Sequence, residues 1–340
     1  MSVTNDRLSE VARCAYRIRR YALRMGEVQG QGYIGQALGY ADVLAVAYGH
    51  ALKFRPGEPG WDGRDRFLLS HGHYAIAFYA ALIEARIIGE EELETYGSDD
   101  SRLPMSGMAS YTPGMEMSGG SLGQGLPIAV GMALALRHKK NPAFVYNSMS
   151  DGELDEGSTW EGAMAAAHHG LGNLICIVDI NNQQADGASS KVLGFEPLAD
   201  KWASFGWHVQ RVDGNHLPAV LRAFDTARQL TDAKPRVILC DTLMGKGVPF
   251  LETREKNTSS ASIHPSGKKP CVCWTNPKTK GIHDERRHRK ETPPDHLGHD
   301  RFDCVRWSTC AGCSFWQGLG RIRCKPPRHR GHDRRLGQVH

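Results

Sequence analysis

Four carboxylates follow an apolar run of the sequence, in the segment SDGELDEG at 150–157. The preceding run, AFVYNSM, has the composition of a buried strand, so Asp151 is expected where that strand ends. The next apolar run, LICIVDI, is followed by Asn181, 30 residues after Asp151. Oxygen side chains at adjacent strand ends suit Mg²⁺. We predict that the Asp151 carboxylate, the Asn181 amide oxygen and the backbone carbonyl of Gln183 bind it. The alternative is a strand end with ordinary turn acids.

Three further features suit a phosphorylated ligand. Gly152 lets the turn after Asp151 pass close to a phosphate, and the following helix adds its positive N-terminal end. Glycines 119, 120, 123 and 125 in MSGGSLGQG let backbone N–H groups approach a ligand, although close helix packing would also explain them. Lys246 lies between two glycines after another strand, which makes it a candidate phosphate contact.

Two histidines flank Gly72 just past a short apolar run, in the segment LLSHGHY. An imidazole at such a position can face a cleft and exchange protons near neutral pH, so His73 is a candidate proton shuttle. The alternative interpretation is a helix cap or a surface feature. Each of these segments is weak alone, and their order and spacing together favour a ligand site.

The elements that must position these residues alternate between strands and helices. LICIVDI is apolar on both faces, which is typical of a parallel sheet covered on each side. We therefore predict an α/β fold with a mostly parallel sheet and helices on both faces. The expected strands are 65–70, 143–149, 174–180 and 236–242, and the expected helices are 6–26, 39–53, 73–85, 121–138, 157–170 and 217–231.

Charge and cysteine content divide the 340-residue chain near residue 257. Residues 1–257 carry 25 Lys and Arg against 30 Asp and Glu, whereas 258–340 carry 17 against 7. Only three of the nine cysteines lie in the first part, so no disulfide framework is expected there and a cytoplasmic location is favoured. The N-terminus lacks the apolar segment of a signal peptide, and the longest apolar run, LPIAVGMALAL, is too short to cross a bilayer.

Residues 258–340 have no sustained period of 2 or 3.6 and few aliphatic side chains. We expect this atypical basic tail, rich in Cys and His, to be disordered or poorly packed because it has too little apolar surface to offset chain entropy. The interpretation that we favour is a shifted reading frame. A zinc module and a nucleic-acid-binding tail are the alternatives, although only Cys310 and Cys313 have the spacing of a zinc knuckle.

Taken in order, five segments of residues 7–257 resemble the N-terminal, diphosphate-binding half of transketolases. They are LLSHGHYAIAFYAAL, MSGGSLGQGLPIAVGMALAL, the segment from SDGELDEG to DINNQQADG, GWHVQRVDGNH and LMGKGVPFLE. More narrowly, the chain is similar to the small bacterial subunits that carry this half as a separate chain. The resemblance implies that residues 1–257 form a domain with the thiamine diphosphate-binding fold.

The resemblance also implies roles for single residues at the metal. Asp151, Asn181 and the carbonyl of Gln183 match the magnesium ligands that anchor thiamine diphosphate in the family. Gly152 matches the glycine beside the diphosphate. These are the residues to which the chemistry of oxygen ligands already pointed.

Five other positions match functional residues of the family. Gly120 and Leu122 match backbone contacts near the cofactor, and His73 matches a histidine that faces the diphosphate and the substrate. Glu156 matches a carboxylate in the relay of acids that links paired active sites. Lys246 is similar in position to a cationic or histidine contact to the cofactor or donor.

The chain departs from the family pattern at three positions. Tyr33 and Ser106 stand where many transketolases have substrate-facing histidines, and Ser150 stands for the first glycine of the usual Gly-Asp-Gly. Losing two imidazoles changes the hydrogen-bond donors that substrate hydroxyls and phosphate would meet. The resemblance therefore implies transfer of a two-carbon ketol unit between sugar phosphates, with an unusual donor or acceptor.

A partner is implied because the family activates the cofactor with a glutamate of a pyrimidine-binding domain, which we do not expect in this sequence. We therefore expect a second subunit that carries that domain, in an α2β2 assembly. Two other functions remain open. One is a 1-deoxyxylulose-5-phosphate synthase-like enzyme, and the other is an inactive, truncated or frame-damaged transketolase-like protein.

Overall fold

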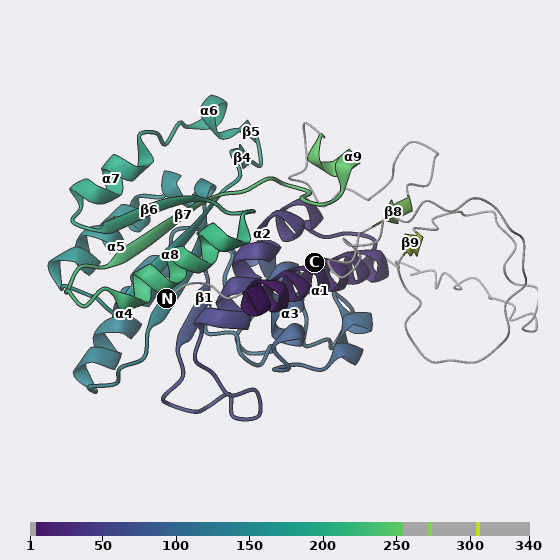
Figure 1. Cartoon of the computed structure of the whole chain (residues 1–340), viewed down its shortest axis with the longest axis horizontal. Helices are drawn as coiled ribbons and strands as arrows, with labels where there is room; N and C mark the ends of the chain where they lie inside the picture. Colours follow the sequence, from purple (N-terminus) through teal and green to yellow (C-terminus); the bar gives the residue numbers. More distant parts are fainter. Residues whose placement is uncertain (1–4, 254–270, 274–303, 307–340) are drawn as a thin grey trace, which may run out of the picture. The chain divides into compact units, whose positions relative to one another are not determined.

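The computed structural model describes residues 5–253, 271–273 and 304–306 (Figure 1). The chain divides into two units, 1–307 and 308–340, and the second lies wholly outside the described residues. The tail 258–340 lies outside them too, apart from the antiparallel strand pair β8 (Cys271–Cys273) and β9 (Cys304–Arg306). The domain boundary at 257 and the interpretations of the tail therefore stay predictions.

A five-stranded parallel sheet, in the order β1-β2-β3-β7-β6, forms the framework of the first unit. All seven residues of β3 are buried, as expected for a strand that has neighbours and helices on every side. The register places Ser150, at the end of β2, opposite Asp179 in β3. The strands are β1 (Arg66–Leu69), β2 (Val145–Ser150), β3 (Leu174–Ile180), β6 (His208–Asp213) and β7 (Arg236–Asp241).

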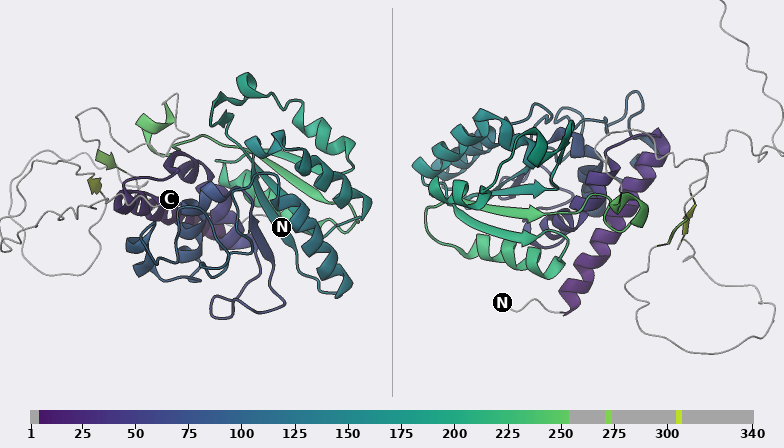
Figure 2. Two further views of the ribbon diagram at one scale, coloured as in Figure 1. Left: turned by 180° about the vertical axis from the view of Figure 1, so that it is seen from behind. Right: turned by 90° about the horizontal axis from the view of Figure 1, so that it is seen from above.

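Helices cover both faces of this sheet, which confirms the predicted α/β fold (Figure 2). Ile175 and Ile177 of β3 pack in the core formed with α1, α2, α3 and α8. Cys176 and Val178 point to the other face and pack in the core formed with α4, α5 and α7. The helices are α1 (Asn5–Gln29), α2 (Ile34–Val46), α3 (Ala75–Glu84), α4 (Gly125–His138), α5 (Gly157–His168), α7 (Leu198–Ser204) and α8 (Leu217–Gln229). No helix in the described residues is both long and apolar enough to cross a membrane.

Two helices begin at least four residues from the expected position. Helix α2 begins at Ile34 rather than at 39, and it continues after Val46 as a π-helical turn, Ala47–Ala51. Helix α4 begins at Gly125 rather than at 121. The reason is backbone geometry, because Gly120 and Gly123 have φ angles of +119° and +79°, which a right-handed helix does not contain.

Strand β6 and the short elements after β3 are additional to those expected from the sequence. Strand β6 is one of the two edge strands, and none of its six residues is fully buried, so no apolar run marks it. Its pairing with β7, from His208 opposite Arg236 onward, determines its conformation. Five more elements were not expected: β4 (Gln183–Gln184), β5 (Gly187–Ala188), α6 (Ser189–Val192), α7 (Leu198–Ser204) and α9 (Pro249–Glu252).

The parallel strands bring polar residues together at one edge of the sheet. Ser70 and His71 follow β1, Asp151 follows β2, Asn181 follows β3 and Thr242 follows β7. In a parallel sheet all these carboxyl ends lie on the same side, where α/β proteins bind ligands. The fold thus gathers the residues that the sequence predicted at separate strand ends.

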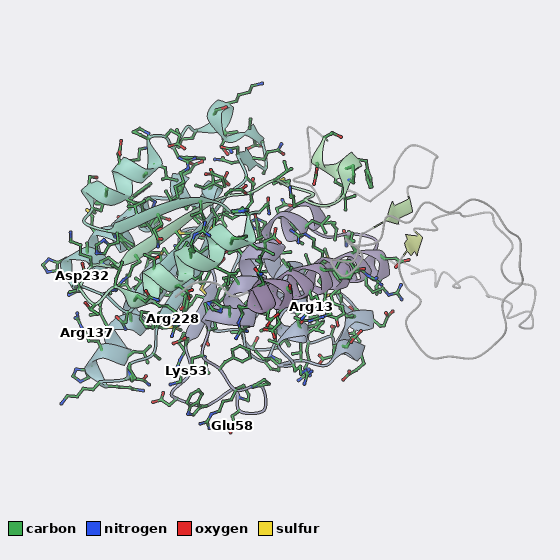
Figure 3. The ribbon with its side chains drawn as sticks, in the orientation of Figure 1. Arg13, Lys53, Glu58, Arg137, Arg228 and Asp232 are labelled. Atoms are coloured by element: carbon green, nitrogen blue, oxygen red, sulfur yellow. The ribbon has the colours of Figure 1, made fainter. Side chains whose placement is uncertain are left out.

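Exposed polar contacts lie at the opposite end of the strands. Asp232, which precedes β7, lies 2.5 Å from the Nε2 atom of His208, and Arg137 at the end of α4 donates to the carbonyls of His169 and Gly170 (Figure 3). Exposed contacts of this kind contribute little to stability because solvent screens them. This end of the strands therefore contributes little to the choice of a ligand site.

Candidate functional site

A cavity of about 550 Å³ opens at the carboxyl edge of the sheet. This volume is within the range of pockets that hold a cofactor or small substrate. Tyr33, Ser106 and Ser150, the three departures from the family pattern, line it. Seven of the nine predicted site residues also line it, and they are His73, Gly120, Leu122, Asp151, Gly152, Asn181 and Gln183.

Asp151 is almost fully buried at the floor of this cavity, with 1 % of its surface exposed. Its Oδ1 atom accepts the backbone N–H of Gly152 at 2.9 Å, and Oδ2 accepts the N–H of Asn182 at 2.9 Å and the Ser189 hydroxyl at 3.2 Å. Burial, and then the nearby Asp179 carboxylate, raise the pKa of Asp151 to about 7. The described hydrogen-bond partners of this buried carboxylate are all neutral. A bound cation would therefore stabilise its charged form.

Asn181 is held by contacts at both ends of its side-chain amide. Its Nδ2 atom donates to the Tyr74 hydroxyl oxygen at 2.9 Å and to Oδ2 of Asp179 at 3.0 Å. Its Oδ1 atom accepts the backbone N–H of Gln183 at 3.0 Å. The amide therefore has its nitrogen toward the protein interior, and its oxygen is left with one lone pair for a further partner.

The glycine-containing loop before α4 is tied to the end of β2 through Glu153. This carboxylate is fully buried, and it accepts the N–H of Gly123 at 3.0 Å, the N–H of Ser150 at 3.1 Å and the Ser70 hydroxyl. Burial raises the pKa of Glu153 in spite of these donors. The loop that carries Leu122 is thus held in place by one carboxylate.

The two histidines have different environments. His73 lies in the turn Gly72–Tyr74 and lines the cavity, with its ring 5.0 Å from the ring of Tyr33. Burial lowers the pKa of His73 to about 4, so its imidazole is neutral at pH 7. His71 is fully buried beneath it, with Nε2 2.8 Å from Oγ of Ser148. One histidine is therefore a cavity residue, and the other belongs to the protein interior.

Glu156 and Lys246 do not line the cavity. Glu156 is exposed at the residue that precedes α5, beside Gly123. Lys246 is half-buried in a turn, where its backbone N–H donates to the carbonyl of Leu243 at 3.2 Å. The nearby Met244, and not Lys246, lines the cavity. The roles that the family resemblance implied for these two residues stay predictions.

The cavity has an acidic lining. Among the described residues that line it there is no Lys or Arg, and Asp151 and Asp186 are its ionisable carboxylic acids. The described residues also contain no cluster of three His, Cys, Asp or Glu side chains that would bind a metal without help from amides, carbonyls or a ligand. An anionic ligand would therefore need to enter this cavity together with a cation.

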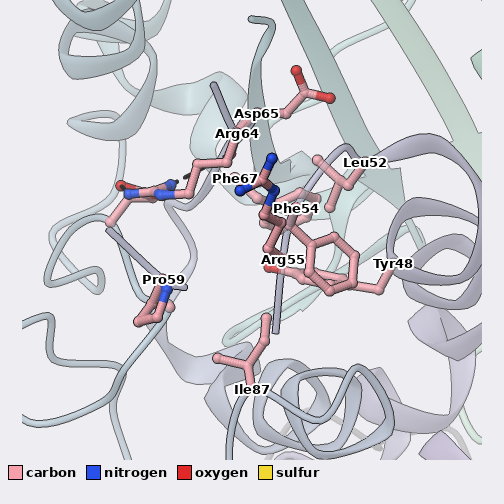
Figure 4. A pocket seen from close by; sticks show the side chains of 11 residues that line it. Tyr48, Leu52, Phe54, Arg55, Pro59, Arg64, Asp65, Phe67 and Ile87 are labelled. Atoms are coloured by element: carbon pink, nitrogen blue, oxygen red, sulfur yellow. Dashed lines mark hydrogen bonds and ion pairs between the residues drawn. The ribbon is translucent and has the colours of Figure 1, made fainter. Parts of the chain in front are cut away.

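A second hollow, near Tyr48, is far smaller (Figure 4). It holds about 40 Å³ and is lined by aromatic rings, Arg55 and an ion pair between Arg64 and Glu116. Room for a water molecule or two is too little for a cofactor. Of these two hollows, the cavity at the carboxyl edge is the one with room for a cofactor.

Sequence reasoning missed seven residues that line the cavity, and two of them are buried side chains that carry polar groups. Gln36, in the first turn of α2, is only 4 % exposed, and its Oε1 atom has no hydrogen-bond partner among the described residues. Tyr74 contributes the hydroxyl that contacts Asn181. Neither lies in a pattern typical of a site, and the only signal was their position next to Tyr33 and His73.

Comparison with known proteins is consistent with this geometry. The family model for "Transketolase, thiamine diphosphate binding domain" matches residues 11–266. The chain belongs to the transketolase family. An uncharacterized transketolase family protein of Sinorhizobium fredii is 70 % identical over 243 residues, which are 72 % of this chain and 87 % of that protein.

Other members of the transketolase family show which part of the enzyme this chain resembles. The 6-deoxy-6-sulfo-D-fructose transketolase subunit of a Clostridium species is 41 % identical over 69 % of this chain and 85 % of its own length. The transketolase structure from Leishmania mexicana matches with a TM-score of 0.69 and 31 % identity over 75 % of this chain, but over only 39 % of that longer protein. This transketolase-family chain is thus of the N-terminal subunit type.

Proposed function

We propose that the chain is the N-terminal subunit of a two-subunit, thiamine diphosphate-dependent transketolase, which transfers a two-carbon ketol unit between sugar phosphates. The observation that carries the proposal is the combination of Asp151 and Asn181 in one acidic cavity. A diphosphate would be repelled by this lining unless a divalent cation entered with it. The family model for the thiamine diphosphate-binding domain agrees with such a ligand.

Magnesium fits the oxygen atoms that the cavity offers. The Asp151 carboxylate, the Asn181 amide oxygen and the carbonyl of Gln183 would hold it, and the diphosphate would complete the oxygen shell. Gly152 leaves room beside the diphosphate, because a Cβ added there would meet nothing closer than 3.8 Å. Gly120 and Leu122, which also line the cavity, would contact the cofactor through their backbone. Charge balance supports these ligands, because a cation would offset the buried negative charge of Asp151, whose pKa is raised in its absence.

Thiamine diphosphate, when bound, supplies a carbanion that breaks and makes carbon–carbon bonds beside a carbonyl group. The chain's own contribution is to bind, orient and exchange protons. The neutral imidazole of His73 would accept a proton from a substrate hydroxyl or share a hydrogen bond with it. Glu156 and Lys246 would act outside the cavity, Glu156 in a relay toward a second active site and Lys246 near the cofactor or donor.

Near Tyr33 and Ser106, where the resemblance implies that many transketolases have histidines, the cavity offers neutral hydrogen-bonding groups. The phenol of Tyr33, the hydroxyl of Ser106 and the amide of Gln36 line it. No cation of the described lining would bind an anionic end of the sugar, so the partner subunit would bind that end. The Clostridium relative is named for a sulfonated ketose, which supports an atypical sugar as substrate.

A partner subunit would complete the site. The relative from Clostridium is named a subunit, and this chain spans 39 % of the Leishmania transketolase. Helices α4 and α5 pack against each other and expose Ile128 and Met164, which are 40 % and 50 % accessible. We assign this apolar face to the pyrimidine-binding partner, in an α2β2 assembly. The first domain would span 1–257, and the tail would lie outside the catalytic part.

Calorimetry of thiamine diphosphate binding to the full chain, with and without Mg²⁺, tests the proposal. We expect binding that requires Mg²⁺, that tightens when the partner is added and that is at least 100-fold weaker in Asp151→Ala. Asp186→Ala is the matched control, because Asp186 lines the same cavity but is exposed. Undiminished binding by Asp151→Ala, or no binding by the unmodified chain with its partner, would contradict the proposal.

A further inference from the structure

Tyr74 and Asp179 form a buried pair directly behind Asn181. Both are 1 % exposed, and the Tyr74 hydroxyl donates to Oδ2 of Asp179. The other carboxylate oxygen accepts the Thr242 hydroxyl at 2.5 Å. The carboxylate therefore has no described ion-pair partner, and it is used entirely as an acceptor of neutral donors.

The amide of Asn181 uses both of its N–H groups on this pair. One goes to the Tyr74 oxygen at 2.9 Å and the other to Oδ2 of Asp179 at 3.0 Å. Rotating the amide by 180° would place its oxygen against the Asp179 carboxylate and against a phenol oxygen whose proton is already donated. Both contacts would be repulsive, so the pair selects the orientation in which the amide oxygen is directed away from it.

From this geometry we propose that Tyr74 is a positioning residue for the metal site: its hydroxyl locks the Asn181 amide in the orientation that presents Oδ1 to the cation. The inference rests on the proposed function, because it takes Asn181 as a metal ligand. Partners that orient a metal ligand commonly change metal affinity by 10- to 100-fold when they are removed.

The Tyr74 ring also packs against other aromatic residues near the cavity. Its ring lies 4.8 Å from the ring of His73 and 5.6 Å from that of Tyr40, so its position is determined by packing on two sides. The turn Gly72–Tyr74 thus contributes an imidazole to the cavity and a phenol to the support of a ligand. A single short turn couples the proton-exchanging group to the metal site.

The test compares Tyr74→Phe with Tyr40→Phe in the full chain. Tyr40 is a matched control, because it is a fully buried tyrosine of the same cluster whose hydroxyl lies 2.6 Å from Oγ of Ser148 and not at Asn181. At saturating thiamine diphosphate, we measure Mg²⁺ affinity by calorimetry and Mn²⁺ affinity by electron paramagnetic resonance. Tyr74→Phe should weaken both affinities at least tenfold, and Tyr40→Phe should leave them within twofold of the unmodified chain.

Two outcomes separate this inference from the proposed function. If the unmodified chain binds the metal and cofactor, Asp151→Ala does not, and Tyr74→Phe binds like Tyr40→Phe, then the role of Tyr74 is wrong and the function stands. If the unmodified chain shows no metal-dependent binding even with its partner present, both fall.

A measurement on the unmodified chain avoids reliance on a variant that folds poorly. Nuclear magnetic resonance of the ligand-free protein should show slow solvent exchange of the Asn181 side-chain N–H protons. The exposed side chain of Asn182 provides the internal reference for fast exchange. Equal exchange at the two residues would overturn the proposal.

Discussion

The Glu153 carboxylate accepts a hydrogen bond from the backbone N–H of Gly123 across 3.0 Å, although 30 residues separate the two. This contact joins the loop after β2 to the loop before α4. Leu122, the neighbour of Gly123, lines the cavity. The position of that cavity wall therefore depends on a carboxylate that itself stays out of the cavity.

Replacement of Glu153 by Ala should lower the free energy of unfolding by about 3 kcal/mol, because it leaves the N–H groups of Gly123 and Ser150 and the Ser70 hydroxyl buried without their acceptor. Urea denaturation measures this change. The control is Glu161→Ala on the exposed surface of α5, which should stay within about 0.5 kcal/mol of the unmodified chain. Equal stability of the two variants would show that the Glu153 contacts contribute little.

Glycine 72 packs against the glycine-containing loop too closely for any side chain. A Cβ added to Gly72 would lie 2.4 Å from the carbonyl carbon of Gly119, and backbone atoms cannot yield that space cheaply. We expect Gly72→Ala to destabilise the fold by about 2–3 kcal/mol. Gly131→Ala, in helix α4 with nothing within 4 Å, should instead stabilise it by about 0.5–1 kcal/mol. Thermal unfolding of both variants checks the opposite signs.

The buried imidazole of His73 makes stability depend on pH. Burial lowers its pKa from 6.5 to about 4, so the unfolded chain takes up the proton first as the pH falls. The contribution of His73 to stability is complete above pH 6.5 and declines between pH 6.5 and 4, by about 3 kcal/mol in full. His73→Gln should remove this part of the decline, as measured by urea unfolding at pH 7.5 and 4.5.

His71 should also contribute to the pH dependence of stability. Burial also lowers the pKa of His71, so a decline in the same direction should persist in His73→Gln. If the variant and the unmodified chain lost equal stability between the two pH values, the imidazole of His73 would already be protonated or exposed in the folded state.

Assembly with the partner should depend on the apolar face of α4 and α5. Met164→Asp places a charge where we expect burial by the partner, so co-purification of the two subunits should fail. The unfolding free energy of the chain alone should stay within about 0.5 kcal/mol, since Met164 is half exposed. Lys234→Asp, exposed at the opposite edge of the sheet, is the control. Normal assembly of Met164→Asp would exclude this face from the interface.

The alternation of strands and helices could be predicted from the sequence because buried strands such as β3 are apolar on both faces and leave a strong local pattern. The edge strand β6 could not, since it is half exposed and its conformation depends on hydrogen bonds to β7. The start of α4 was also misplaced, because the positive φ angles at Gly120 and Gly123 are set by contacts of the loop rather than by composition.

The sequence by itself determined the family, the parallel α/β architecture and the candidate ligands Asp151 and Asn181, because residue types at strand ends follow from local patterns and motif order. Only the tertiary structure decided which residues share a cavity, that Glu156 and Lys246 lie outside it, and that Tyr74 and Glu153 support it from behind. Those relationships depend on hydrogen bonds between residues 30 to 107 positions apart, and no local pattern encodes the partner of a buried polar group.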